Sequence, residues 1–173
     1  MRRLFFALLL VLISTPHLHA SDMERRLEAV FLGRFANYIE LPDRSRSRFV
    51  ITLIDDNPFG GMLDQIYKDK TIHGKPIEIR TTTRVREIGK TDILFITLST
   101  TADRQEAIDY AQRNGIVTIS EARGFAERGG IIQLNFVGQK TQIKINYAAA
   151  QKSGIRIGAP LLSIATVLRG GES

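Results

Sequence analysis

The hydrophobic pattern of the chain centres on Phe49–Ile54, where six apolar or β-branched residues follow one another. Such a run puts bulk on both faces of an extended segment, which predicts a strand buried on both sides. Asp55, Asp56 and Asn57 end the run, and Asn57 followed by Pro58 predicts the N-cap and first turn of a helix. In an open α/β sheet such a turn lies at the carboxyl end of a strand, where ligand crevices form.

Apolar residues at helical spacing predict a long first helix that begins at Ser21 or Asp22 and ends at Pro42. We expect its apolar stripe to cover the sheet and its arginines to lie off that stripe. The predicted stripe consists of Leu27, Val30, Phe31, Phe35, Tyr38 and Ile39, and the residues off it are Arg25, Arg26 and Arg34.

The same spacing and the capping residues predict four further helices. The second is short, has Phe59 on its inner face and ends near Lys68. The others are expected from Thr100 to Asn114, over Tyr147–Lys152 and from Pro160 to Gly170.

Extended segments alternate with these helices. A strand with an irregular or edge-lying start is predicted at Ile72–Arg80, and buried strands are predicted at Ile93–Leu98 and Ile116–Ile119. A period-two pattern from Ile132 to Ile145 predicts an antiparallel hairpin that turns at Gly138 and Gln139. The fold class expected is α/β: a single three-layer domain with a mixed central sheet of about six strands flanked by helices.

The N-terminal segment Met1–Ala20 has the pattern of an export signal. Two arginines precede an apolar run that is too short for a bilayer, which takes about 20 residues, and a small residue closes the segment. Cleavage after Ala20 would leave 153 of the 173 residues. We therefore expect a signal peptide over residues 1–20, a single domain over residues 21–173, and localisation in the periplasm.

Composition excludes several classes of site. The chain has no cysteine, so neither a disulfide nor a thiolate metal site can form, and His73 is the one histidine outside the leader. The formal charge of +6 includes two leader arginines, so the mature chain keeps +4, which is too mild to indicate a nucleic-acid partner. No cofactor or metal is predicted, because the glycine pairs lack the spacing of a phosphate-binding loop.

The adjacent Asp55 and Asp56 suggest a comparison with phospho-receiver domains, which hold magnesium at this position. The later strand Ile93–Leu98 ends without a carboxylate that could accept a phosphoryl group. Successive strand residues also point to opposite faces, so the two aspartates are poorly placed as an acid and base pair. Hydrolase activity therefore has little support, and no catalytic residue is predicted.

Four sequence blocks, in order and spanning nearly the whole mature chain, resemble the YfiR family of periplasmic repressors. The first block ends at a proline, the second carries an aspartate, proline, phenylalanine and glycine turn, the third opens with two glycines, and the last contains a double alanine and a double leucine. They are LEAVFLGRFANYIELP, LIDDNPFGG, GGIIQLNF and KINYAAAQKSGIRIGAPLLSIA. The chain has Leu41 where the family commonly has tryptophan.

The resemblance implies regulation by binding rather than catalysis. Its partner would be the periplasmic sensor domain of an inner-membrane diguanylate cyclase, with a homodimer and an outer-membrane lipoprotein as further expected assemblies. The alternative function is a periplasmic small-molecule-binding sensor domain. The binding residues predicted are a turn, an asparagine thought to share its crevice, and a helix face: Asp56, Asn57, Pro58, Phe59, Gly60, Asn146, Leu161 and Leu162.

Overall fold

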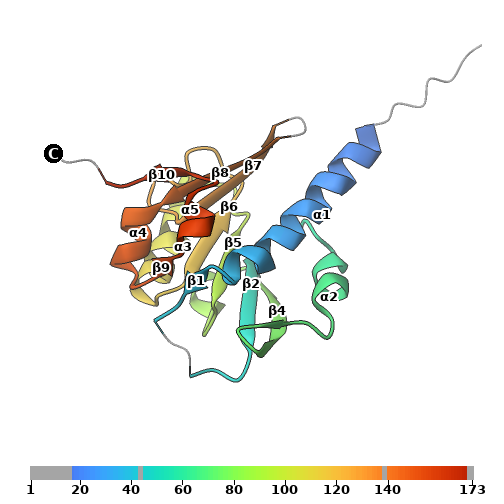
Figure 1. Cartoon of the computed structure of the whole chain (residues 1–173), viewed down its shortest axis with the longest axis horizontal. Helices are drawn as coiled ribbons and strands as arrows, with labels where there is room; N and C mark the ends of the chain where they lie inside the picture. The colour runs from blue at the N-terminus through green and yellow to red at the C-terminus, as the bar shows by residue number, and fades with distance from the viewer. Residues whose placement is uncertain (1–16, 43–44, 138–139, 171–173) are drawn as a thin grey trace, which may run out of the picture.

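The computed structural model describes residues 17–42, 45–137 and 140–170 (Figure 1). Most of the predicted leader therefore lies outside the described residues, as does the turn predicted at Gly138 and Gln139. The helices are α1 (His17–Ala36), α2 (Met62–Tyr67), α3 (Thr101–Arg113), α4 (Tyr147–Lys152), α5 (Ala159–Leu162) and the single 3₁₀ turn η1 (Val85–Glu87). In the described part of the chain, none of them is long and apolar enough to cross a membrane.

The strands form one large mixed sheet and one small ribbon. The large sheet has the order β10-β8-β7-β6-β5-β2-β4-β3, and β1 pairs with β9. Their bounds are β1 (Ile39–Glu40), β2 (Phe49–Ile54), β3 (Thr71–Ile72), β4 (Lys75–Thr82), β5 (Ile93–Ile96), β6 (Val117–Ser120), β7 (Ile132–Val137), β8 (Lys140–Asn146), β9 (Arg156–Ile157) and β10 (Thr166–Leu168). The mixed α/β class and the hairpin of β7 and β8 are confirmed, and the sheet has more strands than expected.

The strand order places a switch point at the centre of the sheet. The chain passes from β2 to β4 on one side and then to β5 on the other, and these strands run parallel. Parallel pairing continues from β5 to β6 and β7, which is the 2-1-3-4-5 order of doubly wound folds. Ligand crevices in such folds form where the carboxyl ends of the two diverging strands meet. Here those ends are the last residues of β2 and β5.

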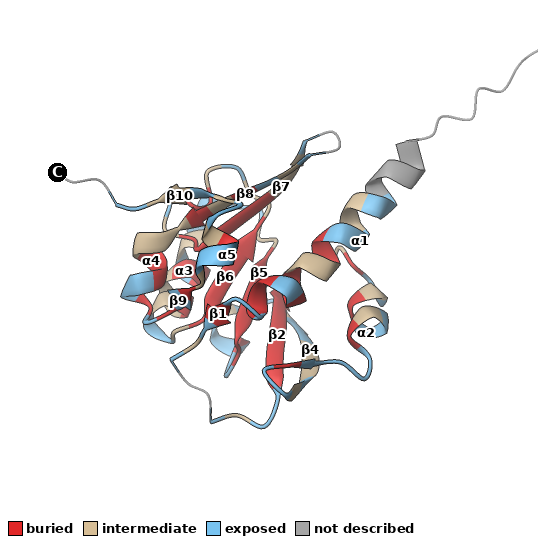
Figure 2. Cartoon of the chain, in the orientation of Figure 1, coloured by how far each residue is buried: buried red, intermediate tan, exposed pale blue. Residues whose placement is uncertain are grey.

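Helices cover both faces of the sheet. On one face, α1, α2, α4 and α5 pack over β2, β5 and β7 in the larger core, whereas α3 packs on the other face in the smaller core with η1. All six residues of β2 are buried, as Figure 2 shows for the centre of the sheet. The prediction of a strand buried on both faces is therefore confirmed.

The inner face of α1 differs from the predicted stripe. Leu27 and Tyr38 are exposed, and Phe31 is half-buried, while Glu28 and Leu32 are fully buried. The stripe chosen from the sequence thus lies partly on the outer side of the helix. The alanines at positions 29 and 36 allow α1 to approach the sheet closely, and the closest face is centred on residues 25, 28, 29, 32 and 36.

Two other predictions need correction. Asn57 does not cap α2, which begins at Met62 after Gly61; instead it closes the preceding turn. The last helix stops at Leu162, and Thr166–Leu168 forms β10, which pairs in parallel with β8. β-branched Thr166 and Val167 favour extended structure, and pairing to a neighbouring strand outweighs the helical spacing of the apolar residues.

Candidate functional site at the switch point

The turn after β2 is held by the ends of both neighbouring strands. Asp55 has φ of 79°, and its N–H donates to the Thr82 carbonyl at 2.8 Å. The Thr97 hydroxyl donates to the carbonyls of Ile54 at 2.7 Å and Asp56 at 3.0 Å. The turn is therefore fixed to β4 on one side and to β5 on the other, directly over the switch point.

The side chain of Asn57 closes the next part of the turn. Its Oδ1 accepts from the Phe59 N–H at 3.0 Å, and its Nδ2 donates to the Gly60 carbonyl at 3.1 Å. Gly60 has φ of 53°, a conformation that glycine adopts without strain. Asn57 and Gly60 are exposed, while Pro58 is half-buried. Their hydrogen bonds explain the residue types without a ligand, so their binding role stays a prediction.

Phe59 connects the turn to α1. Its ring is buried and lies edge-on to Phe95 of β5, with the ring centroids 5.1 Å apart. The guanidinium of Arg25 lies over the ring of Phe59, 5.6 Å from its centroid, within the range of a cation–π interaction. The turn residue thus positions a charged side chain of α1 at the carboxyl edge of the sheet.

Arg25 joins two carboxylates. It forms ion pairs with Glu28 on α1 and, at 3.0 Å, with Glu121 after β6. Glu28 is 0% exposed, and within the described residues its Oε1 has no hydrogen-bond partner. Burial, and secondarily the charge of Glu121, raises the pKa of the Glu28 carboxyl to about 8, although Arg25 opposes the shift. A buried carboxyl of this kind holds a proton near neutral pH.

A hollow of about 290 Å³ opens beside this cluster, at the carboxyl ends of β5 and β6. Arg104 stands at its rim and donates to the carbonyls of Leu98 at 2.7 Å and Ser99 at 2.8 Å. The lining of the hollow combines hydroxyl groups, side chains of both charges and Phe95, which suits a small polar molecule. Within the described residues no group of three histidine or acidic side chains could hold a metal ion. The lining residues are Phe95, Ile96, Thr97, Leu98, Ser99, Arg104, Ser120, Glu121 and Ala122.

The other predicted binding residues lie away from the turn. Asn146 ends β8, and β7, β6 and β5 separate that strand from β2, so Asn146 and Phe59 do not line one crevice. Both polar atoms of its side chain are used: Oδ1 accepts from the Ala149 N–H at 2.8 Å, and Nδ2 donates to the Ala126 carbonyl at 2.7 Å. Leu161 is buried in the larger core, and Leu162 packs against it. Whether these residues bind a partner stays a prediction.

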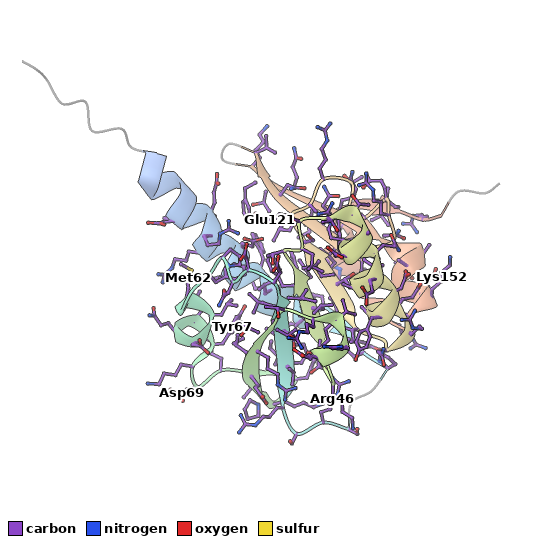
Figure 3. The ribbon with its side chains drawn as sticks, turned by 180° about the vertical axis from the view of Figure 1, so that it is seen from behind. Arg46, Met62, Tyr67, Asp69, Glu121 and Lys152 are labelled. Carbon is purple, nitrogen blue, oxygen red and sulfur yellow. The ribbon has the colours of Figure 1, made fainter. Side chains whose placement is uncertain are left out.

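A tyrosine on α2 fixes α1 at its middle. The Tyr67 hydroxyl accepts from the Gly33 N–H at 2.6 Å and donates to the Ala29 carbonyl at 2.5 Å. These are the two backbone groups that an α-helix normally joins to each other, so the hydroxyl bonds to both partners of one helical position in α1. Figure 3 shows Tyr67 between α2 and α1. Burial raises the pKa of Tyr67 to about 12, which keeps the hydroxyl protonated.

Sequence reasoning missed four residues of this region: Arg25, Glu28, Tyr67 and Glu121. The sequence prediction places Arg25 off the apolar stripe, because charged side chains usually face water, and it gives Glu28 no role. The one available signal was Gly33 in mid-helix, because an isolated glycine within a helical pattern often marks a close approach. An added Cβ at Gly33 would lie 2.5 Å from the Tyr67 ring.

Comparisons with known proteins place these features in context. Residues 25–166 match the family described as YfiR/HmsC-like. No curated protein matches the chain. A conserved domain protein from Vibrio cholerae O1 biovar El Tor has a similar solved structure, with a TM-score of 0.57 and 15% identity over 83% of this chain. So does the ABC domain in complex with L-Trp from Streptococcus pneumoniae, with a TM-score of 0.55 and 13% identity over 84% of this chain.

This chain covers 59% and 60% of the two solved chains, so it spans about three fifths of the length of each. At these identities the similarity shows the arrangement of helices and strands and nothing about a shared ligand.

Proposed function

Because this chain belongs to the YfiR/HmsC-like family, a family of non-enzymatic regulatory proteins in cyclic di-GMP signalling, we propose that it is a periplasmic repressor. It binds the periplasmic sensor domain of an inner-membrane diguanylate cyclase and lowers the production of cyclic di-GMP. The predicted leader directs it to the periplasm, where it acts as a homodimer, and an outer-membrane lipoprotein is its second partner.

The observation that carries this proposal is the family match over residues 25–166. The matched residues include the cluster of Arg25, Glu28 and Glu121, the turn after β2 and the double-alanine start of α4. The polar side chains of this region are used within the fold. Asn57 at the turn and Asn146 at the end of β8 each hydrogen-bond to the backbone, and the carboxyl groups of Glu28 and Glu121 share Arg25. These groups organise a surface; they do not form a nucleophile and base pair.

Repression of this kind is a shift between two states of the cyclase. The repressor must bind the inactive sensor domain more tightly than the active one, because a ligand with equal affinity for both shifts nothing. A difference of about 3 kcal/mol changes the ratio of the two states more than 100-fold.

The test is deletion of the gene in its own host, followed by measurement of cyclic di-GMP. We expect the level to rise and to return when the wild-type chain is supplied. An unchanged level, in cells that normally express both the chain and the cyclase encoded beside it, would contradict the proposal. A second deletion, of that cyclase, should abolish the rise.

The alternative, a small-molecule sensor, is favoured by the hollow of about 290 Å³ at the switch point and by the fold shared with a domain solved with L-Trp. Calorimetry of the purified chain with anions, nucleotides and aromatic amino acids tests it. Binding that is lost in Arg104→Ala but kept in the control Arg113→Ala, at the exposed end of α3, would support this function. The absence of heat at millimolar ligand would count against it.

A further inference from the structure

The outer side of α1 carries a row of interface-type residues. We call it the outer stripe and define it as Met23, Leu27, Phe31, Arg34 and Tyr38, which recur at helical spacing and end two residues past the end of α1. Met23 is 60% exposed, Leu27 42% and Tyr38 47%. Single exposed apolar side chains are common, but several gathered along one line of a helix mark a candidate interaction surface.

The outer stripe continues onto the tip of the β7 and β8 hairpin. The rings of Phe31 and Phe136 lie with their centroids 6.4 Å apart, and the next residue of β7, Val137, is 56% exposed. Figure 1 shows α1 and this hairpin extending beyond the rest of the sheet on the same side of the molecule. Of the five large apolar residues exposed in the described part of the chain, four lie here, and Ile164 is the fifth.

The inner face of α1 holds this surface in place. Arg25 ties α1 to Glu121 at 3.0 Å, and the Tyr67 hydroxyl is bonded to the helix backbone at Ala29 and Gly33. A partner that binds the outer stripe therefore meets a helix that is already ordered. The binding free energy does not have to offset the entropy lost in ordering α1.

The residue types also match those of protein interfaces. Aromatic residues, methionine and arginine are enriched at interface centres, and acidic residues and lysine are depleted there. The outer stripe has Phe31, Tyr38, Met23 and Arg34, and it contains no carboxylate and no lysine. This composition favours a protein partner over a small solute.

Charge identifies the kind of partner. Arg34 lies within the outer stripe and Arg26 beside it; both are exposed, and neither forms an ion pair within the described residues. Two outer stripes facing each other would bury both Arg34 guanidiniums without a carboxylate, which is costly. A partner with an apolar surface would cover the exposed apolar side chains of the outer stripe, and a carboxylate opposite Arg34 would pair with its charge.

We propose that the outer stripe of α1, extended by Val137, is the docking surface for the cyclase sensor domain, which presents to it an apolar face bearing a carboxylate. This inference rests on the proposed repression of a cyclase and adds to it the surface that makes the contact. It assigns binding to the outer side of α1 and not to the turn after β2.

The test is photocross-linking in cells whose cyclic di-GMP rises when the gene is deleted, so that the proposed function has already been established. A photoreactive phenylalanine analogue replaces Leu27, and in separate strains it replaces Ile164 as a matched exposed apolar control. A third strain carries it at Asp64, on the exposed side of α2. Cross-linked products are identified by mass and by antibody against the cyclase.

We expect position 27 to capture the cyclase, and Arg34→Glu in the same chain to reduce that product at least tenfold. Positions 164 and 64 should capture little. Capture of a second copy of this chain from position 27, or capture of the cyclase from position 164 or 64 but not from 27, would overturn the proposed surface while leaving the repressor function intact. Loss of the product in Arg34→Glu, with its recovery in Arg34→Lys, would confirm the requirement for positive charge.

Discussion

Each side of α1 departs from the usual distribution of residues on a surface helix. Among its apolar residues the inner side buries the carboxyl group of Glu28 and half-buries Arg25, whereas the outer side exposes Met23, Leu27 and Tyr38 beside its arginines. A helix that only covered a sheet would place its apolar residues inward and its charges outward. The inner side fixes the position of the helix, and the exposed apolar residues of the outer side are the ones that we propose bind a partner.

The difference separates two kinds of mutational effect. Inner-side changes should lower the free energy of unfolding, because they remove buried contacts. Outer-side changes should leave that free energy nearly unchanged and weaken repression. The predictions below test this separation, from the largest expected effect to the smallest.

The largest loss of stability is expected for Phe59→Ala. This substitution removes a buried ring that contacts both Phe95 and Arg25, and such truncations typically cost about 3–5 kcal/mol. Urea unfolding measures the change. Phe59→Leu, which keeps much of the volume, should cost clearly less, and equal costs for the two variants would contradict the assigned packing.

Gly33→Ala should cause the next largest loss of stability. The new Cβ would lie 2.5 Å from the Tyr67 ring, so the ring must move and its hydroxyl leaves the backbone of α1. Overpacking of this kind costs about 1–3 kcal/mol. Gly61→Ala is the control, because a Cβ at that position meets nothing within 4 Å. If the two variants unfold at the same urea concentration, Tyr67 does not fix α1.

Glu28→Gln should change how the free energy of unfolding depends on pH more than it changes that free energy at low pH. The pKa of Glu28 is about 8 in the folded chain against an ordinary value of 4.5, so the folded state binds the proton more tightly. The contribution of protonated Glu28 to the free energy of unfolding is therefore fully present below pH 4.5. It is lost as the pH rises to about 8, by at most ~1.4 kcal/mol per pH unit.

Glutamine resembles the protonated acid, so Glu28→Gln should flatten this part of the profile and be the more stable chain at pH 8. Thermal unfolding between pH 5 and pH 9 measures both chains, with Glu106→Gln on the exposed side of α3 as the control. Parallel profiles for wild type and Glu28→Gln would show that Glu28 is not buried as a neutral acid.

The sequence was sufficient for the elements whose local pattern and packing agree. The β2 strand, the α3 helix with its Thr100 cap and the β7 and β8 hairpin were predicted correctly, because burial on both faces, capping chemistry and period-two alternation each have one structural solution. The pairing of Thr166–Leu168 with β8 could not be predicted, because it depends on a strand about 20 residues earlier.

The candidate site was predicted only in part. The turn from Asp55 to Gly60 lies at the switch point, as its place after a buried strand indicated. The Arg25, Glu28 and Glu121 cluster was missed because it joins residues nearly 100 positions apart, and helical spacing alone ranks charged residues as outward-facing. The helical spacing of apolar residues also places Leu27 and Tyr38 on the inner stripe, but both are exposed in the structure.

The most direct test of this account is the level of cyclic di-GMP in deletion cells supplied with Leu27→Asp or with the control Ile164→Asp, at equal amounts of protein. Both positions are exposed, 42% and 63% respectively, so both chains should fold with unfolding midpoints close to wild type. We predict that Leu27→Asp fails to repress while Ile164→Asp represses fully. Full repression by a folded Leu27→Asp chain would contradict the assignment of the outer side of α1 to partner binding.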